Sequence, residues 1–166
     1  KFKVAPPGLP SAIRLPYPLV DNGTLQAGEY GGWLGASYNP IVIRTPNGKE
    51  FGGVSRDLGA SRINPKEAID RQKLSSRLGL LSRLNQFSGT GPAINDLEHF
   101  QGLATDMLMS PTVRKAFDLD LEPDSVHSKF GKHICGQSML LARRLIEARV
   151  PIVTVACSAG DLNGSK

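Results

Sequence analysis

The sequence predicts an α/β fold, and three features of the chain carry that prediction. Leucines recur at helical spacing after Pro65, a nearly continuous apolar run rich in β-branched residues spans 150–157, and the first 64 residues are rich in proline and glycine. A strand without polar alternation that follows helices is typical of a parallel sheet flanked by helices. We expect three parts of one incomplete domain: an irregular arm or lid at 1–64, a helical layer at 65–149, and a central strand with the start of an active-site loop at 150–166.

Composition and charge narrow the classes of protein that the chain could represent. Its 166 residues suit one domain, and its 40% apolar and 21% charged residues are close to globular averages. The 20 basic residues exceed the 15 acidic ones but are dispersed, which favours a solvated surface over a nucleic-acid interface. No apolar run approaches the ~18 residues of a membrane span. Cys135 and Cys157 are too few for a disulfide scaffold, while a single bridge stays open.

Residues 1–64 differ from the rest of the chain in composition. They hold seven of the 12 prolines and ten of the 18 glycines, and five of these prolines fall within the first 18 residues. Each proline fixes φ and removes a backbone donor. We therefore expect neither a helix nor a central strand in this opening, and we interpret it as an arm that covers a surface provided by the rest of the protein.

Two aromatic residues of the arm are candidates for binding. Trp33 and Tyr38 lie in the glycine-rich stretch 31–38. Their rings either pin the arm to the core, which is the interpretation that we favour, or stack against a ligand. Both residues are therefore kept as candidate substrate-binding residues.

Leucine spacing predicts the first helix, and a capping signal predicts the second. Leucines at 74, 78, 81 and 84 recur at steps of four, three and three, which places them on one face of a helix over 65–87. Asn95 and Glu98 have the spacing of a capping box and predict the start of a second helix. The buried stripe of that helix is expected to comprise Leu97, Phe100, Ala104, Met107 and Leu108.

Boundary signals predict the remaining helices. Ser110-Pro111 begins a short helix, because proline at the first helical position loses no donor that the helix needs. Residues 124–130 add one or two turns that end at Gly131. The final helix is strongly apolar over 139–146, and Arg143-Arg144 beside Glu147 indicates an exposed ion-paired face rather than an anion clamp.

The apolar run at 150–157 is predicted to be a strand buried on both faces. Such a strand needs neighbouring strands. The only candidate in the sequence is 41–43, which could also form a short hairpin with 49–54. We therefore expect its partners to lie mostly in sequence outside these residues.

Ligands of open α/β sheets bind beyond the carboxyl ends of strands, a place that residues 158–166 occupy. Asp161 and Asn163 are the candidate substrate-binding residues there, and an ordinary polar loop is the alternative that we favour. The three histidines lack the spacing of metal ligands, so surface or capping roles are expected for them. Neither cysteine has a sequence context that supports a catalytic role.

Several strings of the chain resemble one family. They are Leu15-Pro16-Tyr17-Pro18, residues 32–40 (GWLGASYNP), Ala116-Phe117-Asp118-Leu119, Glu122-Pro123 and, most specifically, residues 136–148 (GQSMLLARRLIEA). In this order they resemble the large bacterial family of uncharacterised sulfatase-like proteins in the alkaline-phosphatase superfamily. The resemblance covers nearly the whole chain. It departs from the family pattern at Arg149, where a glycine commonly ends the helix.

The resemblance implies an alkaline-phosphatase-like α/β sandwich and an exported or periplasmic protein. It also implies a parent that hydrolyses sulfuric or phosphoric esters with a divalent metal, of which this chain is a part that lacks the catalytic centre and binds no metal itself. The expected partners are a sulfated or phosphorylated small molecule or glycan and the remainder of the parent chain. The alternative is a non-catalytic exported protein that binds a glycan or another partner on the same fold. No metal ligand or nucleophile of the family maps onto a residue of this sequence.

Overall fold

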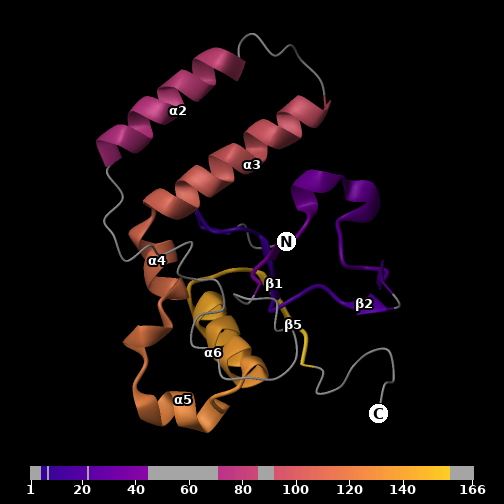
Figure 1. Ribbon diagram of the computed structural model, residues 1–166, viewed down its shortest axis with the longest axis vertical. Coiled ribbons are helices and arrows are strands. Elements are labelled where there is room, and N and C mark those ends of the chain that lie inside the picture. Colours follow the sequence, from indigo (N-terminus) through magenta and orange to yellow (C-terminus); the bar gives the residue numbers. More distant parts are fainter. Residues whose placement is uncertain (1–4, 7, 22, 45–70, 86–91, 158–166) are drawn as a thin grey trace.

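The computed structural model describes residues 5–6, 8–21, 23–44, 71–85 and 92–157 (Figure 1). Its centre is a three-stranded parallel sheet in the order β4-β1-β5. The strands are β1 (Ala12–Leu15), β4 (Ile41–Val42) and β5 (Ile152–Val155). The α/β fold predicted from the sequence is confirmed.

β1 corrects the expectation that prolines exclude a central strand from the opening of the chain. It lies between β4 and β5, with Ile13 opposite both Ile41 and Val153. Pro10 and Pro16 flank the paired residues 12–15, so no donor of the ladder is lost. The expectation that residues 41–43 alone could pair with β5 was also wrong, because β1 is the neighbour of β5 and β4 pairs on the other side of β1.

β5 is not buried on both faces within the described residues. Val153 and Val155 pack against the core, whereas Ile152 and Thr154 on the opposite face are exposed. Strand residues alternate between faces, so one face of β5 meets the core and the other is open. The continuous apolar run therefore overstated the burial of this strand.

The core forms where α6 (Ile134–Glu147) packs beside the sheet (Figure 1). Leu141 and Leu145 on α6 and Ile13 and Leu15 on β1 are all fully buried. Burying one such side chain contributes roughly 1.5–3 kcal/mol. These four side chains belong to one buried cluster, so α6 and β1 share the apolar core.

The other helices are α2 (Arg71–Asn85), α3 (Pro92–Met109), α4 (Pro111–Phe117) and α5 (Asp124–Phe130). The prediction for α4 is confirmed, since the Ser110 side chain accepts a hydrogen bond from the Val113 amide at 3.4 Å. The prediction for α5 is confirmed as well, because Gly131 ends it with a φ of 89°. Among the described residues, none of the helices has the length and apolarity needed to cross a membrane.

One helix boundary differs from expectation, and another ends on an unusual residue. α3 begins at Pro92, so Asn95 lies inside the helix and the capping box predicted with Glu98 does not form. α6 ends at Glu147, and Arg149 adopts a left-handed φ of 73°, the conformation that glycine favours at this place. The predicted helix start at Pro65 and the hairpin strand at 49–54 lie outside the described residues.

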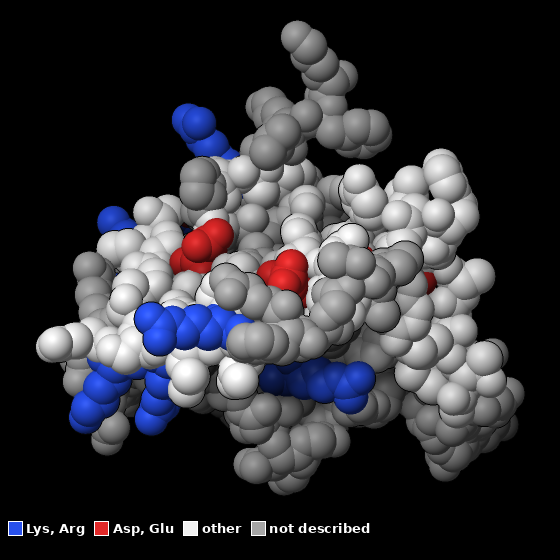
Figure 2. Space-filling view, turned by 90° about the horizontal axis from the view of Figure 1, so that it is seen from above, with Lys and Arg blue, Asp and Glu red and all other residues white. Residues whose placement is uncertain are grey.

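Short elements build the arm. A two-stranded antiparallel ribbon pairs β2 (Val20–Asp21) with β3 (Thr24–Leu25), and two 3-10 turns follow, η1 (Gly32–Leu34) and η2 (Ala36–Tyr38). A third turn, η4 (Leu119–Leu121), links α4 to α5. Figure 2 looks onto the end of the molecule that carries α2, α3 and the arm, and the Lys and Arg side chains visible on this face lie in the left and central parts of the view.

A buried ion pair fastens the arm to the sheet. Arg14 projects from the face of β1 opposite to Ile13 and Leu15, and it pairs with Glu29 of the arm. The two side chains are only 7% and 5% exposed, and the second Glu29 oxygen accepts a hydrogen bond from the Leu19 amide at 3.2 Å. Arg14 Nε has no hydrogen-bond partner in the part of the chain that the structure describes. The buried positive charge of Arg14 is therefore balanced by the Glu29 carboxylate.

Replacing Glu29→Ala should lower the free energy of unfolding by about 3 kcal/mol, because it leaves the Arg14 charge buried and uncompensated. Urea denaturation followed by circular dichroism measures the change. Glu147→Ala is the matched control, since it removes a carboxylate from the exposed Arg143–Glu147 pair and should leave the midpoint unchanged. Equal effects of the two substitutions would contradict the proposed role of Glu29.

Candidate functional site

The carboxyl ends of the three parallel strands meet at one edge of the sheet, where α/β proteins place their ligand sites. β1 continues into Pro16 and Tyr17, both buried, and β5 continues into Ala156 and Cys157. The Ala156 amide donates to the Leu15 carbonyl at 2.7 Å, which extends the pairing of the two strands by one bond at this edge. The edge is therefore a fixed platform for whatever loops follow the strands.

A disulfide holds this edge together. Cys135 in the first turn of α6 is bonded to Cys157 just after β5, with a Cα–Cα distance of 5.3 Å. The bond joins the amino end of the helix to the carboxyl end of the strand that follows it. Because both sulfurs are in the bridge, neither cysteine is a thiol nucleophile. The bridge that the composition left open is present.

Asp161 and Asn163, predicted as candidates beyond β5, lie outside the described residues. Their role in substrate binding remains a prediction. Within the described ranges, no group of three His, Cys, Asp or Glu side chains is arranged to hold a metal ion.

His127 corrects the expectation of surface or capping roles for the histidines. It is only 2% exposed, with Nδ1 2.6 Å from Gln137 Oε1 and Nε2 3.0 Å from the Leu119 carbonyl oxygen. Gln137 Nε2 in turn donates to the Gly131 carbonyl at 2.7 Å. These bonds cross-link η4, α5 and α6 without leaving an open position for a ligand. His127 therefore has a structural role.

The other two histidines agree with the prediction. His133 precedes α6, and its Nδ1 accepts a hydrogen bond from the Gly136 amide at 3.1 Å, which caps the helix. His99 is exposed on α3, with its ring 5.7 Å from that of Phe100. No described contact joins either of these side chains to the carboxyl ends of the strands.

The two arginines of α6 have different surroundings. Arg143 Nε donates to Glu147 at 2.8 Å on an exposed face, as predicted, and the hydrogen bond and charge of Glu147 raise the pKa of Arg143. Arg144 is nearly buried; it pairs with Glu122 and donates to the carbonyl oxygens of Ala116, at 3.2 Å, and Lys115. Since these carbonyls end α4, Arg144 closes that helix and is not an anion clamp.

Trp33 and Tyr38 project from the arm. Trp33 is 94% exposed and Tyr38 is 64% exposed, so the favoured interpretation that both rings pin the arm to the core was wrong. Tyr30 and Leu34, which sequence reasoning did not select, are also exposed on this segment. The arm therefore presents a group of aromatic and apolar side chains to the surroundings.

Hydrogen bonds that involve side chains define the shape of this part of the arm. The Gly31 amide donates to Asn39 Oδ1 at 2.8 Å, and the Ser37 hydroxyl bonds to Asp96 of α3. Gly35 joins the two turns with a φ of 96°, a conformation that other residues rarely adopt. Trp33 and Tyr38 are thus carried on two successive turns that are tied to each other and to α3.

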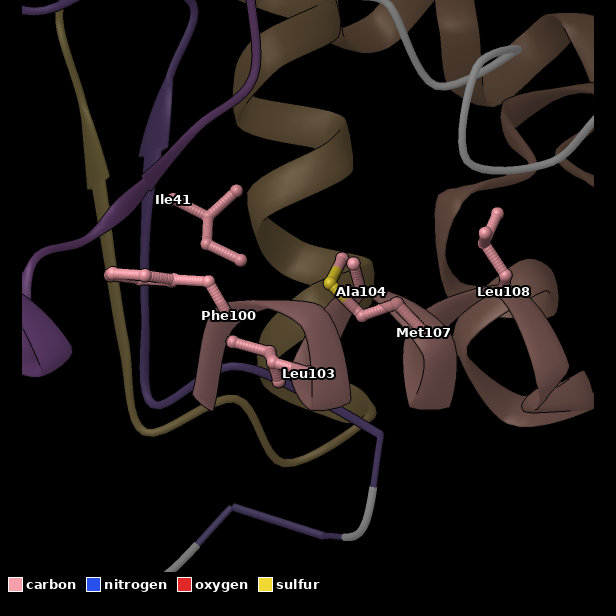
Figure 3. Close-up of a pocket in the computed structure, with 6 residues that line it drawn as sticks. All are labelled: Ile41, Phe100, Leu103, Ala104, Met107 and Leu108. Atoms are coloured by element: carbon pink, nitrogen blue, oxygen red, sulfur yellow. The ribbon is translucent and has the colours of Figure 1, made fainter. Parts of the chain in front are cut away.

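An apolar groove of about 380 Å³ lies between α3 and β4 (Figure 3). Figure 3 shows its lining side chains, which are Ile41, Phe100, Leu103, Ala104, Met107 and Leu108. None of them carries a group that can donate a proton, attack a bond or hold a metal. The groove therefore offers no chemistry of its own.

Fold and site together define an α/β protein with a disulfide at the carboxyl edge of a small parallel sheet. The family of proteins of unknown function called DUF1501 matches residues 4–161, which is nearly the whole chain. The chain belongs to this family. No curated protein and no solved structure matches it.

Reduction of the Cys135–Cys157 bridge should lower the free energy of unfolding by about 3 kcal/mol, because the bridge closes a loop between residues 22 positions apart. The change is measured by denaturation with and without a phosphine reductant. The variant with Cys135→Ser and Cys157→Ser serves as control, since the reductant should leave it unchanged. Two free thiols titrated in the unreduced, denatured protein would contradict the assignment.

Proposed function

We propose that the chain is part of an exported, metal-dependent hydrolase of sulfuric or phosphoric esters. The observation that carries the proposal is the edge at which the parallel strands β4, β1 and β5 all end. Loops from several strand ends can converge there on one substrate. Residues 136–148, the string that most specifically resembles sulfatase-like proteins, form most of α6, and the disulfide holds the amino end of α6 at this edge.

Ester hydrolysis of this kind needs an activated nucleophile and divalent cations that neutralise charge on the transferred group. In the proposal these groups come from sequence outside the described residues, and the described residues supply the arm, the helical layer and the strands. Asp161 and Asn163 follow β5 within eight residues and are the proposed contacts to the substrate. A sulfated or phosphorylated small molecule or glycan is the proposed substrate.

The disulfide supports the proposed export. Structural disulfides persist in oxidising compartments, such as the bacterial periplasm, and are rare where cytosolic reductants act. A bond between Cys135 and Cys157 therefore favours an exported or periplasmic protein.

Protein expressed from the complete reading frame should hydrolyse an aryl sulfate or an aryl phosphate, and a chelator should abolish the turnover. Asp161→Asn should raise KM about tenfold with a smaller effect on kcat, because a substrate contact is weakened. Asp120→Asn, at an exposed position of η4, is the control and should have the same kinetic constants as the unsubstituted protein. Absence of turnover on both esters with Mg²⁺, Ca²⁺, Mn²⁺ and Zn²⁺ would count against the hydrolase.

A second candidate function is glycan binding without catalysis, which the 94% exposure of Trp33 favours. Aromatic rings present a broad apolar face that can stack on the apolar face of a sugar ring. Tyr38 on the next turn adds a second ring with a polar hydroxyl. An exposed aromatic side chain contributes little to the free energy of folding. A contact with a partner outside the chain therefore explains the exposure of Trp33 better.

Binding of oligosaccharides should change the intrinsic fluorescence of Trp33, which is the single tryptophan of the chain. In calorimetric titrations Trp33→Ala should weaken binding at least about tenfold, whereas Trp33→Phe should retain most of it. The melting temperature of both variants should stay unchanged, because the side chain is exposed. Equal affinity of the parent protein and Trp33→Ala for neutral and sulfated oligosaccharides would exclude this function.

A further inference from the structure

α2 differs from the other helices in how little of it is buried. None of the α2 side chains that the structure describes is buried, whereas each of the other α-helices buries at least one described residue. Figure 1 places α2 at the outer edge of the molecule, far from α5 and α6. An isolated helix of 15 residues is marginal in water. An apolar surface against which α2 packs would therefore stabilise it.

Helical spacing divides the exposed and half-buried residues of α2 into two neighbouring stripes. Leu74, Leu78 and Leu81 are half-buried and form the stripe turned toward the protein. The next stripe follows steps of four, three and four and consists of Lys73, Arg77, Leu80 and Leu84, all of them exposed. Leu80 is 60% exposed and Leu84 is 57% exposed. One stripe thus combines cations and large apolar side chains in contact with solvent.

The charge of α2 selects among possible partners. The helix contains four basic residues and no acidic one. A second copy of the chain would bring like charges together if α2 packed on α2, which costs free energy. A nucleic acid would pair with the cations but offers no apolar surface for Leu80 and Leu84. An anionic bilayer meets both needs, because its phosphates attract the cations and its acyl boundary accepts leucine.

We propose that α2 docks on an anionic lipid surface. Leu80 and Leu84 enter the boundary between headgroups and acyl chains, and Arg77 extends along the same stripe to the phosphates. A helix of this length lies flat over roughly 22 Å of the surface. The proposal is independent of the hydrolase and of glycan binding, since it involves neither the sheet edge nor the arm.

The test is sedimentation of the chain with large unilamellar vesicles of phosphatidylcholine alone or with one third phosphatidylglycerol. Binding should require phosphatidylglycerol and weaken in 0.5 M salt. Arg77→Ser should lower the partition coefficient roughly fivefold, because one basic residue leaves the surface. Leu80→Asp should lower it at least about tenfold, because a carboxylate replaces an inserted side chain.

Two matched controls lie on other elements. Lys129→Ser on α5 removes the same charge from an exposed position, and Leu121→Asp on η4 replaces a leucine that is 55% exposed. Both should change partition less than twofold. The circular dichroism spectrum and the melting temperature of all four variants should match those of the unsubstituted chain. If Leu80→Asp fails to fold, Leu80→Ser repeats the test.

Several results would overturn the proposal. They are equal binding to both kinds of vesicle, equal losses in the controls and the α2 variants, or no sedimentation at low salt. Tighter binding to an RNA duplex that depends on Arg77 and not on Leu80 would instead assign α2 to nucleic acid.

Discussion

The parallel pairing of β1 with β5 is the constraint on which the rest of the structure depends. It joins Ala12–Leu15 to Ile152–Val155 across most of the length of the chain, and hydrogen bonds beyond the ladder extend it at both ends, from Ile152 to Ser11 and from Ala156 to Leu15. Long-range strand pairing is costly in chain entropy, so it needs strong contacts around it. The buried side chains of α6, the Arg14–Glu29 pair and the disulfide provide them on three sides.

Sequence reasoning predicted those elements whose signals are local. Ser110-Pro111 and Gly131 mark the limits of α4 and α5, because capping and left-handed termination involve neighbouring residues only. β1 was missed because the prolines on both sides of it were taken to exclude a strand. The four residues of β1 lie between these prolines and keep their backbone N–H donors. Arg149 shows the reverse case: the helix ends with a hydrogen bond from the Val150 amide to the Leu145 carbonyl at 2.9 Å, and a residue other than glycine takes the left-handed conformation that this ending needs.

The burial of Arg14, Glu29, His127 and Gln137 could not be predicted, because each side chain is stabilised by a partner ten or more residues away in the sequence. Arg14 reads as an interruption of an apolar run until Glu29 is placed over it, 15 residues later. Gln137 and His127 read as surface residues until their side chains meet between α5 and α6. For the candidate site the limit is different: the composition left the disulfide open, and the exposure of Trp33 depends on the path of the arm relative to the core.

The arm and α2 both expose apolar side chains, and the chemistry of each surface indicates which partner it suits. The arm presents Trp33 and Tyr38 from turns fixed by hydrogen bonds, and rigid rings recognise a partner of defined shape. α2 presents leucines beside cations, and none of its side chains that the structure describes is buried; such a surface suits a partner that is anionic, apolar beneath and without fixed shape. A chain that held its sheet edge near a membrane through α2 would leave the arm free to meet soluble ligands. Adsorption and recognition would then act on different elements of one fold, so that a substitution in one surface leaves the other intact.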